Sequence, residues 1–115
     1  MLKSISAALA ASLFLALAAP ASARDCGRAS WYALHSKTAS GERMNPQAFT
    51  AAHRSMRFGT KLRLTNPRNG RTVVVRINDR GPFIKGRVLD VSKAAAQQLG
   101  FIRSGHANLC MERLS

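Results

Sequence analysis

Two acidic residues, Glu42 and Asp79, have the sequence context of groups that could carry out acid–base chemistry. The chain of 115 residues contains only five acidic side chains. Asp79 lies in the stretch RINDRGPF, residues 76–83, between two arginines and just before a Gly-Pro turn, and Glu42 lies in the polar stretch TASGERMN. Cleavage of a glycosidic bond needs a carboxylic acid that protonates the leaving oxygen and a group that stabilises positive charge at the anomeric carbon. The pair therefore fits glycoside cleavage.

The acids also have structural interpretations, which the sequence leaves open. Glu42 could be an exposed loop acid, and Asp79 could be a turn-forming aspartate paired with arginine. Asp25 and Glu112 lie beside the two cysteines near the ends of the chain, and we expect them to be surface charges. Asp90 precedes a helical segment, where a carboxylate can cap the free N–H groups. Glu42 and Asp79 remain the only credible pair for acid–base work.

His53, in the stretch FTAAHRS, adds a side chain that can donate or orient a proton near neutral pH, although it could equally be a partly buried structural histidine. The three histidines show no H-x-x-x-H or H-x-x-E spacing, so we predict no metal site and no cofactor. There is no G-x-S-x-G or Cys-His pattern, which argues against acyl transfer.

Residues 1–23 are typical of a secretory signal peptide. Lys3 supplies the positive start, AALAASLFLALAA the apolar stretch, and Ala21-Ser22-Ala23 the small residues of a cleavage site. The alternative is an N-terminal membrane anchor. No acylation motif precedes Cys26, so we expect a periplasmic or secreted protein without a stable membrane anchor. Residues 24–115 then form one small domain of 92 residues.

Cys26 and Cys110 lie almost at the two ends of that domain. In an oxidising compartment we expect them to pair as a disulfide, the alternative being two free thiols.

The formal net charge is +13, and it falls to +12 when Lys3 leaves with the signal peptide. Such a charge attracts anionic partners. The basic residues are scattered and lack interleaved aromatic residues, which, with export, argues against nucleic acid. Outside the cytoplasm the available anions are peptidoglycan carboxylates, phospholipid head groups and acidic polysaccharides.

Short β segments separated by Gly, Pro and Asn dominate the pattern after residue 24. We predict strands at 29–34, 61–65, 71–78, 87–91 and 108–114, a loop at 37–48, and a hairpin turn at Asn69-Gly70. Residues 92–99 change to a helical period, with Asp90 or Ser92 as the N-cap and Gly100 after the last turn. Five or six short strands with one helix favour a compact closed barrel.

The ordered motifs ASWY, TASGE, TAAH, FGT, VRINDRGPF and DVSKAAA, between residue 27 and about residue 112, resemble the rare lipoprotein A (RlpA-like) double-psi β-barrel family. The resemblance implies a mainly β fold, a six-stranded double-psi barrel with one short helix, related to the first domain of expansins. It also implies an endolytic peptidoglycan transglycosylase. Such enzymes prefer naked glycan strands, cleave the MurNAc-β-1,4-GlcNAc bond without water and leave 1,6-anhydro-MurNAc ends.

The same resemblance maps the family's acidic and histidine positions onto Glu42, His53 and Asp79. Arginines on both sides of Asp79 would keep it ionised, so we expect Glu42 to move the proton, Asp79 to stabilise positive charge, and His53 to position one of them. Substrate-binding candidates are Tyr32, Asn45, Arg80 and Asp90. Asn45 stands where many relatives have aspartate, and it can hydrogen-bond a sugar but cannot act as a base.

Larger relatives carry a lipid anchor and a glycan-binding C-terminal repeat domain, and we expect this chain to find peptidoglycan with the barrel alone, as a monomer. The alternative function is a non-catalytic, expansin-like module that binds or loosens the wall. Trp31, Tyr32 and Phe83 could then line a sugar platform, although Trp31 and Phe83 are equally typical of barrel core.

Overall fold

The computed structural model describes residues 25–115, and the predicted signal peptide at 1–23 lies outside the described residues. The elements follow in the order β1 (Asp25–Tyr32), β2 (Thr50–Ala52), β3 (Lys61–Thr65), β4 (Thr72–Asp79), β5 (Leu89–Ser92), α2 (Lys93–Leu99) and β6 (His106–Arg113).

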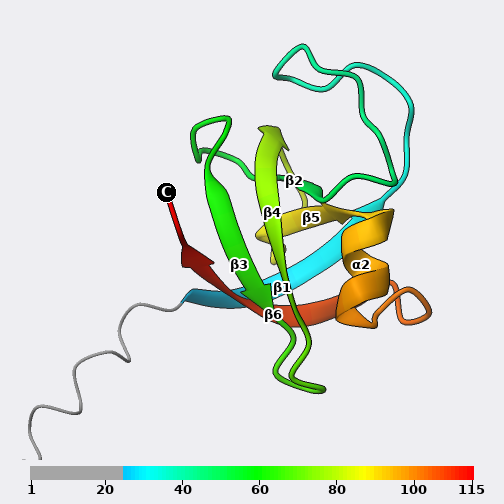
Figure 1. The fold of residues 1–115 in the computed structure, drawn as a ribbon, viewed down its shortest axis with the longest axis vertical. Coiled ribbons are helices and arrows are strands. Elements are labelled where there is room, and N and C mark those ends of the chain that lie inside the picture. The colour runs from blue at the N-terminus through cyan, green and yellow to red at the C-terminus, as the bar shows by residue number, and fades with distance from the viewer. Residues whose placement is uncertain (1–24) are drawn as a thin grey trace, which may run out of the picture.

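The six strands close into one barrel in the order β1-β5-β2-β4-β3-β6. Two neighbouring pairs, β1 with β5 and β2 with β4, are parallel, and the other pairs are antiparallel. The predicted six-stranded barrel with one short helix is therefore confirmed for residues 25–115. Figure 1 shows α2 packed beside the barrel and the long β1–β2 connection projecting beyond the end where β4 finishes.

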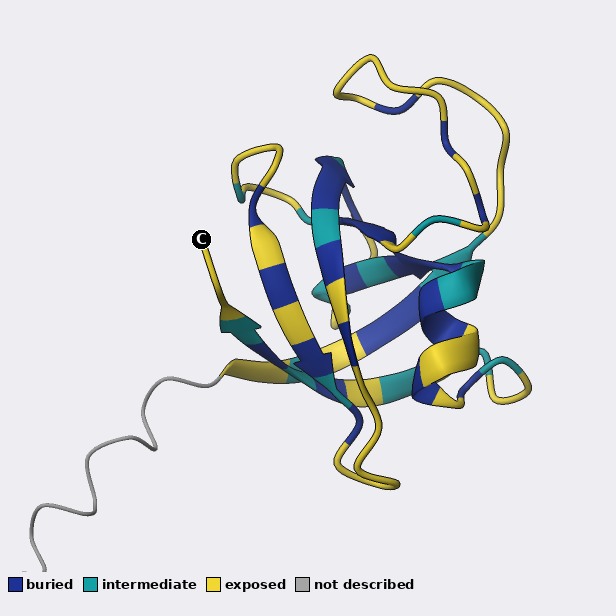
Figure 2. Ribbon diagram, viewed as in Figure 1, coloured by how far each residue is buried: buried dark blue, intermediate teal, exposed yellow. Residues whose placement is uncertain are grey.

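The β3–β4 hairpin shows how the sequence pattern builds the wall of the barrel. Leu62 and Leu64 alternate with exposed residues along β3, and Val73 and Val75 do the same along β4, so one face of each strand enters the core. Figure 2 shows the resulting bands of buried and exposed residues. The pairing of Thr65 with Thr72 and the turn between them confirm the predicted hairpin.

The short strand β2 was not predicted. Its three residues, Thr50, Ala51 and Ala52, are all buried, so the segment shows no alternation between core and solvent. It is held instead by long-range pairing, parallel to β4 on one side and antiparallel to β5 on the other. Strand β3 has the predicted ends, 61–65, and the other predicted strands exist with ends displaced by one to four residues, the largest shift being at the start of β1.

The helix α2 begins and ends at the residues expected from capping chemistry. Ser92 is the N-cap, because its Oγ accepts the N–H of Ala95 at 3.2 Å, and it also donates to the carbonyl of Ala48 at 2.6 Å. Gly100 adopts φ 77° at the C-terminus. Asp90 does not cap the helix, so that alternative is wrong. It lies within β5, where its carboxylate accepts a hydrogen bond from the Ser30 hydroxyl.

Gly100→Ala should destabilise the domain more than Gly70→Ala does. Both glycines have φ 77°, but a Cβ at Gly100 would lie 2.8 Å from Asn69 Nδ2, whereas a Cβ at Gly70 would meet no atom within 4 Å. Backbone strain alone costs about 1 kcal/mol in each variant, and Gly100→Ala adds the clash. Urea unfolding of the two variants measures the difference. Equal losses would show that the Asn69 side chain simply moves aside.

Cys26 and Cys110 are paired in registered positions of β1 and β6, with an S–S distance of 2.07 Å. The predicted disulfide is therefore confirmed, and it joins the first and last strands of the barrel. Among residues 25–115, no helix has the length and apolar character needed to span a membrane.

Candidate active site

A tight loop presents Glu42 at one end of the barrel. Lys37 and Arg43 form a bridge at its base, and Thr38 closes it by donating to the Glu42 carbonyl from both its backbone N–H at 2.8 Å and its hydroxyl at 2.6 Å. Gly41 supplies φ 95°, which a tight turn requires here. The TASGE motif is thus a compact folded turn.

This loop docks on the end of β4, which carries Asp79. The N–H of Ala39 donates to Asp79 Oδ1 at 2.9 Å, and the N–H of Ser40 donates to the Asn78 carbonyl at 3.3 Å. The structure therefore brings the loop of Glu42 against the end of β4. Glu42 and its partner Asn78, the residue before Asp79, are 36 positions apart in the chain.

Glu42 is held as a charged carboxylate. Arg76 binds both of its oxygens, at 3.1 and 3.0 Å, and Asn78 Nδ2 donates to Oε1 at 2.6 Å. The hydrogen bonds from Arg76, followed by the one from Asn78, lower the pKa of Glu42 below its ordinary value. The prediction that Glu42 has the environment of a proton donor is therefore wrong, because a proton donor needs the opposite shift.

Asp79 has a different set of partners. Its Oδ2 accepts the hydroxyl of Tyr32 at 3.0 Å, and its Oδ1 accepts the N–H groups of Ala39 and Arg80, each at 2.9 Å. Within residues 25–115 no cation forms a salt bridge with it. Burial, and then the hydrogen bond to Asp79, raise the pKa of Tyr32 above its ordinary value, so Tyr32 remains a hydroxyl donor.

The guanidinium of Arg80 points away from Asp79. It donates to the carbonyls of Met56 at 2.8 Å and His53 at 3.2 Å, and it stacks 4.0 Å from the centre of the Phe58 ring. With Arg76 committed to Glu42, neither flanking guanidinium pairs with Asp79, so the predicted pairing with arginine side chains is wrong. The nearer partner of Asp79 is the turn itself, through the backbone N–H of Arg80.

His53 lies beside Asp79 through the backbone rather than through its ring. Its N–H donates to the Asp79 carbonyl at 3.1 Å, while its Nδ1 accepts the N–H groups of Ser55 and Met56, both at 3.1 Å. In the part of the chain that the structure describes, the ring has no hydrogen bond to Glu42 or Asp79. The ring is therefore Nε2-protonated, and Nε2 is its only uncommitted nitrogen.

The pKa of His53 lies below its ordinary value. Burial is the main cause, and three nearby arginines add to it: Arg54, Arg80 and Arg113. His53 is accordingly neutral at neutral pH and fixes the loop that follows β2.

The substrate-binding candidates Asn45 and Asp90 have structural partners. Asn45 Oδ1 accepts the N–H of Gln47 at 2.9 Å, which is the hydrogen bond of an Asx turn, and an aspartate would make it equally well. Replacing aspartate with asparagine at this position therefore preserves the turn. Asp90 pairs with Ser30, and its charge contributes to the raised pKa of Tyr32.

Trp31 and Phe83, which the sequence left open as barrel core or as part of a sugar platform, differ in burial. Trp31 packs against the core and donates from Nε1 to the Ile102 carbonyl at 3.3 Å. Phe83 is 78% exposed, so the core alternative is wrong for this residue. Its ring lies over Gly81, two residues from Asp79 in the chain.

Sequence reasoning missed the roles of Arg76 and Asn78. Both side chains reach Glu42, so they lie on the same side of β4, as alternation predicts. The sequence could not reveal that the 37–43 loop docks on that side.

Glu42 should titrate with a midpoint below the ordinary value of 4.5. Because its folded-state pKa is the lower one, the stability that it contributes is present above pH 4.5 and is lost as the pH falls through the folded-state pKa. The effect on overall stability is small, because the side chain is 41% exposed. Carboxyl NMR of the wild type and of Arg76→Gln measures the titration midpoint of Glu42. The midpoint should rise in the variant, and an unchanged midpoint would contradict the assignment of Arg76 as the main cause of the lowered pKa.

Within residues 25–115 no three His, Cys, Asp or Glu residues are grouped so that they could hold a metal ion.

The chain matches the family described as lytic transglycolase over residues 24–111. It is 65% identical over 77 residues to the probable endolytic peptidoglycan transglycosylase RlpA of a Nostoc species, a match that covers 67% of this chain and 21% of the relative. It is 50% identical over 91 residues to the endolytic peptidoglycan transglycosylase RlpA of Neisseria meningitidis, covering 76% of this chain and 38% of the relative. The chain thus spans well under half the length of these relatives.

Two solved structures share the barrel. The Streptomyces papain inhibitor superposes with a TM-score of 0.68 at 18% identity, covering 80% of this chain and 94% of the inhibitor. An expansin of Clavibacter michiganensis superposes with a TM-score of 0.65 at 24% identity, covering 80% of this chain and 50% of the expansin. At these identities the similarity concerns the fold alone.

Proposed function

The chain belongs to the lytic transglycolase family, and from this premise we propose that it is an endolytic peptidoglycan transglycosylase that cleaves MurNAc-β-1,4-GlcNAc bonds of naked glycan strands. The observation that carries the proposal is the placement of Asp79 at the end of β4, where the TASGE loop docks; its carboxylate is oriented by a hydroxyl and two N–H groups and pairs with no cation within residues 25–115.

Asp79 is the group proposed to move the proton. Its protonated form donates to the glycosidic oxygen as the bond from that oxygen to the MurNAc anomeric carbon breaks. The C6 hydroxyl oxygen of the same MurNAc then bonds to the anomeric carbon, and its proton returns to Asp79. The products are a free GlcNAc hydroxyl and a 1,6-anhydro ring, and no water is consumed. A glycan lying over the site excludes water, which favours the uncharged form of a carboxyl.

Glu42 serves as a fixed negative charge in this proposal. Its pKa is lowered by Arg76, so it stays ionised while positive charge develops on the sugar. The same ion pair anchors the loop whose Ala39 N–H orients Asp79. The hydroxyl of Tyr32 holds the second Asp79 oxygen, Oδ2.

Phe83 offers a stacking surface for a sugar ring, because its exposed ring lies close to Asp79 in the chain and against Gly81. His53 and Arg80 act indirectly, by holding the segment 53–58 that follows β2. Asn45 completes the loop as a turn residue.

The proposed location is the periplasm or the cell exterior. A disulfide between Cys26 and Cys110 is typical of oxidising compartments, and peptidoglycan is found there. The proposed protein acts as a monomer and binds no nucleic acid.

Digestion of peptide-stripped glycan strands by the purified protein tests the proposal, with mass spectrometry of the fragments as the measurement. Fragments ending in 1,6-anhydro-MurNAc are expected. A wild-type protein that yields no fragments but still co-sediments with sacculi would contradict catalysis and support the alternative, a non-catalytic wall-binding module of the expansin kind.

A further inference from the structure

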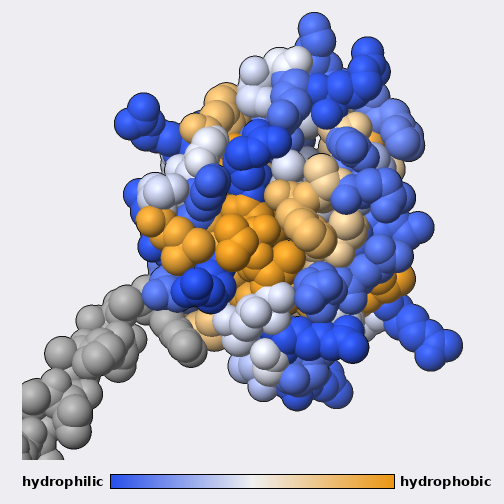
Figure 3. Space-filling model, in the orientation of Figure 1, coloured by the Kyte–Doolittle hydropathy of each residue, from blue (hydrophilic) through white to orange (hydrophobic). Residues whose placement is uncertain are grey.

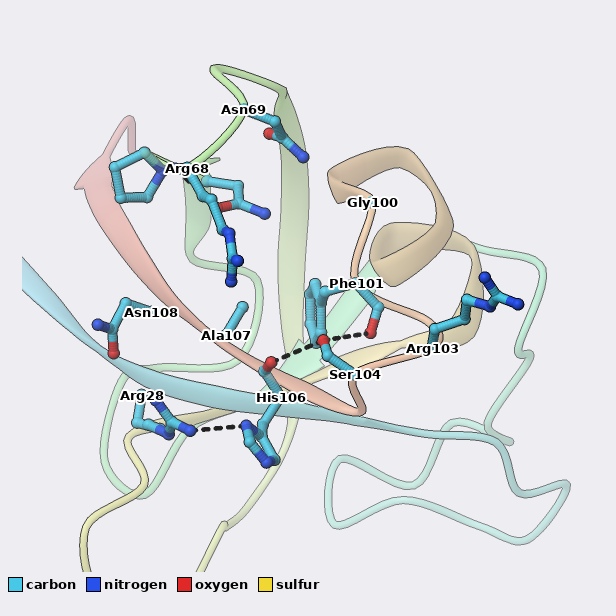
Figure 4. Close-up of a pocket in the computed structure, with 12 residues that line it drawn as sticks. Arg28, Arg68, Asn69, Gly100, Phe101, Arg103, Ser104, His106, Ala107 and Asn108 are labelled. Atoms are coloured by element: carbon cyan, nitrogen blue, oxygen red, sulfur yellow. Dashed lines mark hydrogen bonds between the residues drawn. The ribbon is translucent and has the colours of Figure 1, made fainter.

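A groove of about 890 Å³ lies away from the candidate active site. It is formed by β1, the turn between β3 and β4, the segment that follows α2, and the beginning of β6, and none of the predicted catalytic residues lines it. Figure 4 shows Phe101 at its centre, with side chains from the four segments around it. Its volume is that of a site for a small ligand.

The groove and Asp79 lie at opposite ends of β4. The turn that carries Arg68 leads into Thr72, the first residue of β4, and Asp79 is the last. Eight residues of strand separate the two ends by roughly 23 Å, at about 3.3 Å per residue. Figure 1 shows the β3–β4 turn at the opposite end of the barrel from the β1–β2 connection. A ligand in the groove therefore leaves the candidate active site free.

The groove is positively charged. Arg28, Arg68 and Arg103 line it, and no acidic residue of the described chain does. Figure 4 shows Arg68 extending into the hollow and Arg103 extending away at the rim. Arg28 is oriented by a 2.7 Å hydrogen bond from its guanidinium to His106 Nδ1. Within residues 25–115, no hydrogen bond or salt bridge engages the guanidinium of Arg68, whereas those of Arg63, Arg76 and Arg80 are all engaged.

The wall of the groove is rigidly built. Asn66 and Asn69 both donate from Nδ2 to the Leu99 carbonyl, at 2.9 and 3.0 Å, which ties the turn that carries Arg68 to the end of α2. Phe101 forms an apolar floor and is only 3% exposed. The groove thus combines a preformed apolar floor with guanidinium groups at its sides, and such a site loses little entropy when a ligand binds.

We propose that this groove binds the carboxylate-bearing stem peptide of peptidoglycan, an inference that rests on the proposed function. Guanidinium groups bind carboxylates with two parallel hydrogen bonds, and Arg28 and Arg68 offer such groups where no acid competes. Stem peptides are short, carry free carboxylates and are rich in alanine, which suits a floor of Phe101 and Ala107. A phospholipid head group offers a single phosphodiester charge and no apolar part small enough to cover that floor.

The groove would hold a peptide-bearing strand while the opposite end of the barrel acts on a naked one. Where a strand that carries peptides lies beside a naked one, one molecule would be tethered to the first and cut the second. Tethering raises the local concentration of the cleavable strand without a change in the cleavage site.

Titration of the purified protein with a soluble disaccharide-tetrapeptide muropeptide, followed by amide NMR, tests the inference. Shifts are expected in residues 66–69 and 100–108, and the same disaccharide without its peptide should leave them unchanged. Arg68→Gln should weaken muropeptide binding about tenfold, the effect of losing one charge-assisted hydrogen-bonded pair. Lys61→Gln, which removes one exposed positive charge elsewhere on the barrel, should have no effect.

Cleavage of naked strands separates this inference from the proposed function, because Arg68→Gln should cleave them as fast as wild type does. Several results would overturn the inference: no binding of the muropeptide, binding that survives Arg68→Gln, shifts confined to residues 38–42 and 78–80, or groove shifts produced by phosphatidylglycerol vesicles and not by the muropeptide. Absence of cleavage by wild type together with normal muropeptide binding would overturn only the proposed function.

Discussion

Asp79→Asn should lower the rate of glycan cleavage by about 10²–10⁴-fold, the usual contribution of a positioned general acid and base. Asparagine fills the same space, and its Oδ1 can keep the N–H groups of Ala39 and Arg80. The Tyr32 hydroxyl can rotate to accept from the new amide. The variant therefore keeps the geometry of the site and loses only the proton that it must transfer.

Product formation from peptide-stripped strands measures this effect, and thermal unfolding shows that Asp79→Asn remains folded. Asp25→Asn is the matched control, because it makes the same chemical change at an exposed position at the beginning of β1. Full cleavage by Asp79→Asn would remove Asp79 from the mechanism. Glu42→Gln should lose less activity than Asp79→Asn, because it removes the attraction to Arg76 and the fixed negative charge but leaves the proton-transferring carboxyl of Asp79 in place, and glutamine can still accept from Asn78.

Replacing both Cys26 and Cys110 with alanine should lower the free energy of unfolding by about 4 kcal/mol, since the disulfide closes a loop across a separation of 84 residues. For a domain of this size the loss corresponds to a fall of roughly 20 °C in the unfolding temperature. The bond joins the first and last strands of a small barrel whose core is modest, so little else restrains the two ends.

Denaturant unfolding of the wild-type protein, the double variant and the wild-type protein with added reductant measures the contribution of the disulfide. The reduced wild type and the double variant should unfold at the same, lower denaturant concentration. Unfolding of all three at one concentration would show that the barrel does not depend on this bond.

The parts of the fold that the sequence predicted are those set by local chemistry. The β3–β4 hairpin follows from alternation and an Asn-Gly turn, and the ends of α2 follow from Ser92 and Gly100. Strand β2 could not be predicted, because three buried residues between two partner strands carry no period. The exposure of Phe83 could not be predicted either, since an aromatic residue in a loop is as compatible with a core as with a surface.

The hydrogen-bond and ion-pair partners of the two site acids could not be predicted from their neighbours in the sequence. Arg76 and Arg80 flank Asp79 in sequence, yet Arg76 binds Glu42 and Arg80 binds the carbonyls of the 53–56 segment. The sequence identified Glu42 and Asp79 as candidates, whose segments the fold brings together, but the partners of each depend on where the 37–43 loop docks. Figure 3 shows that hydrophilic residues surround an apolar area on the face in view.

The most direct test of non-hydrolytic cleavage at Asp79 is digestion of naked glycan strands in water enriched with heavy oxygen. The account predicts that wild-type products end in 1,6-anhydro-MurNAc and contain no heavy oxygen at the new end, and that Asp79→Asn forms these ends about 10²–10⁴-fold more slowly. Heavy oxygen at the new reducing end would mean that water attacks the anomeric carbon, and it would contradict the account.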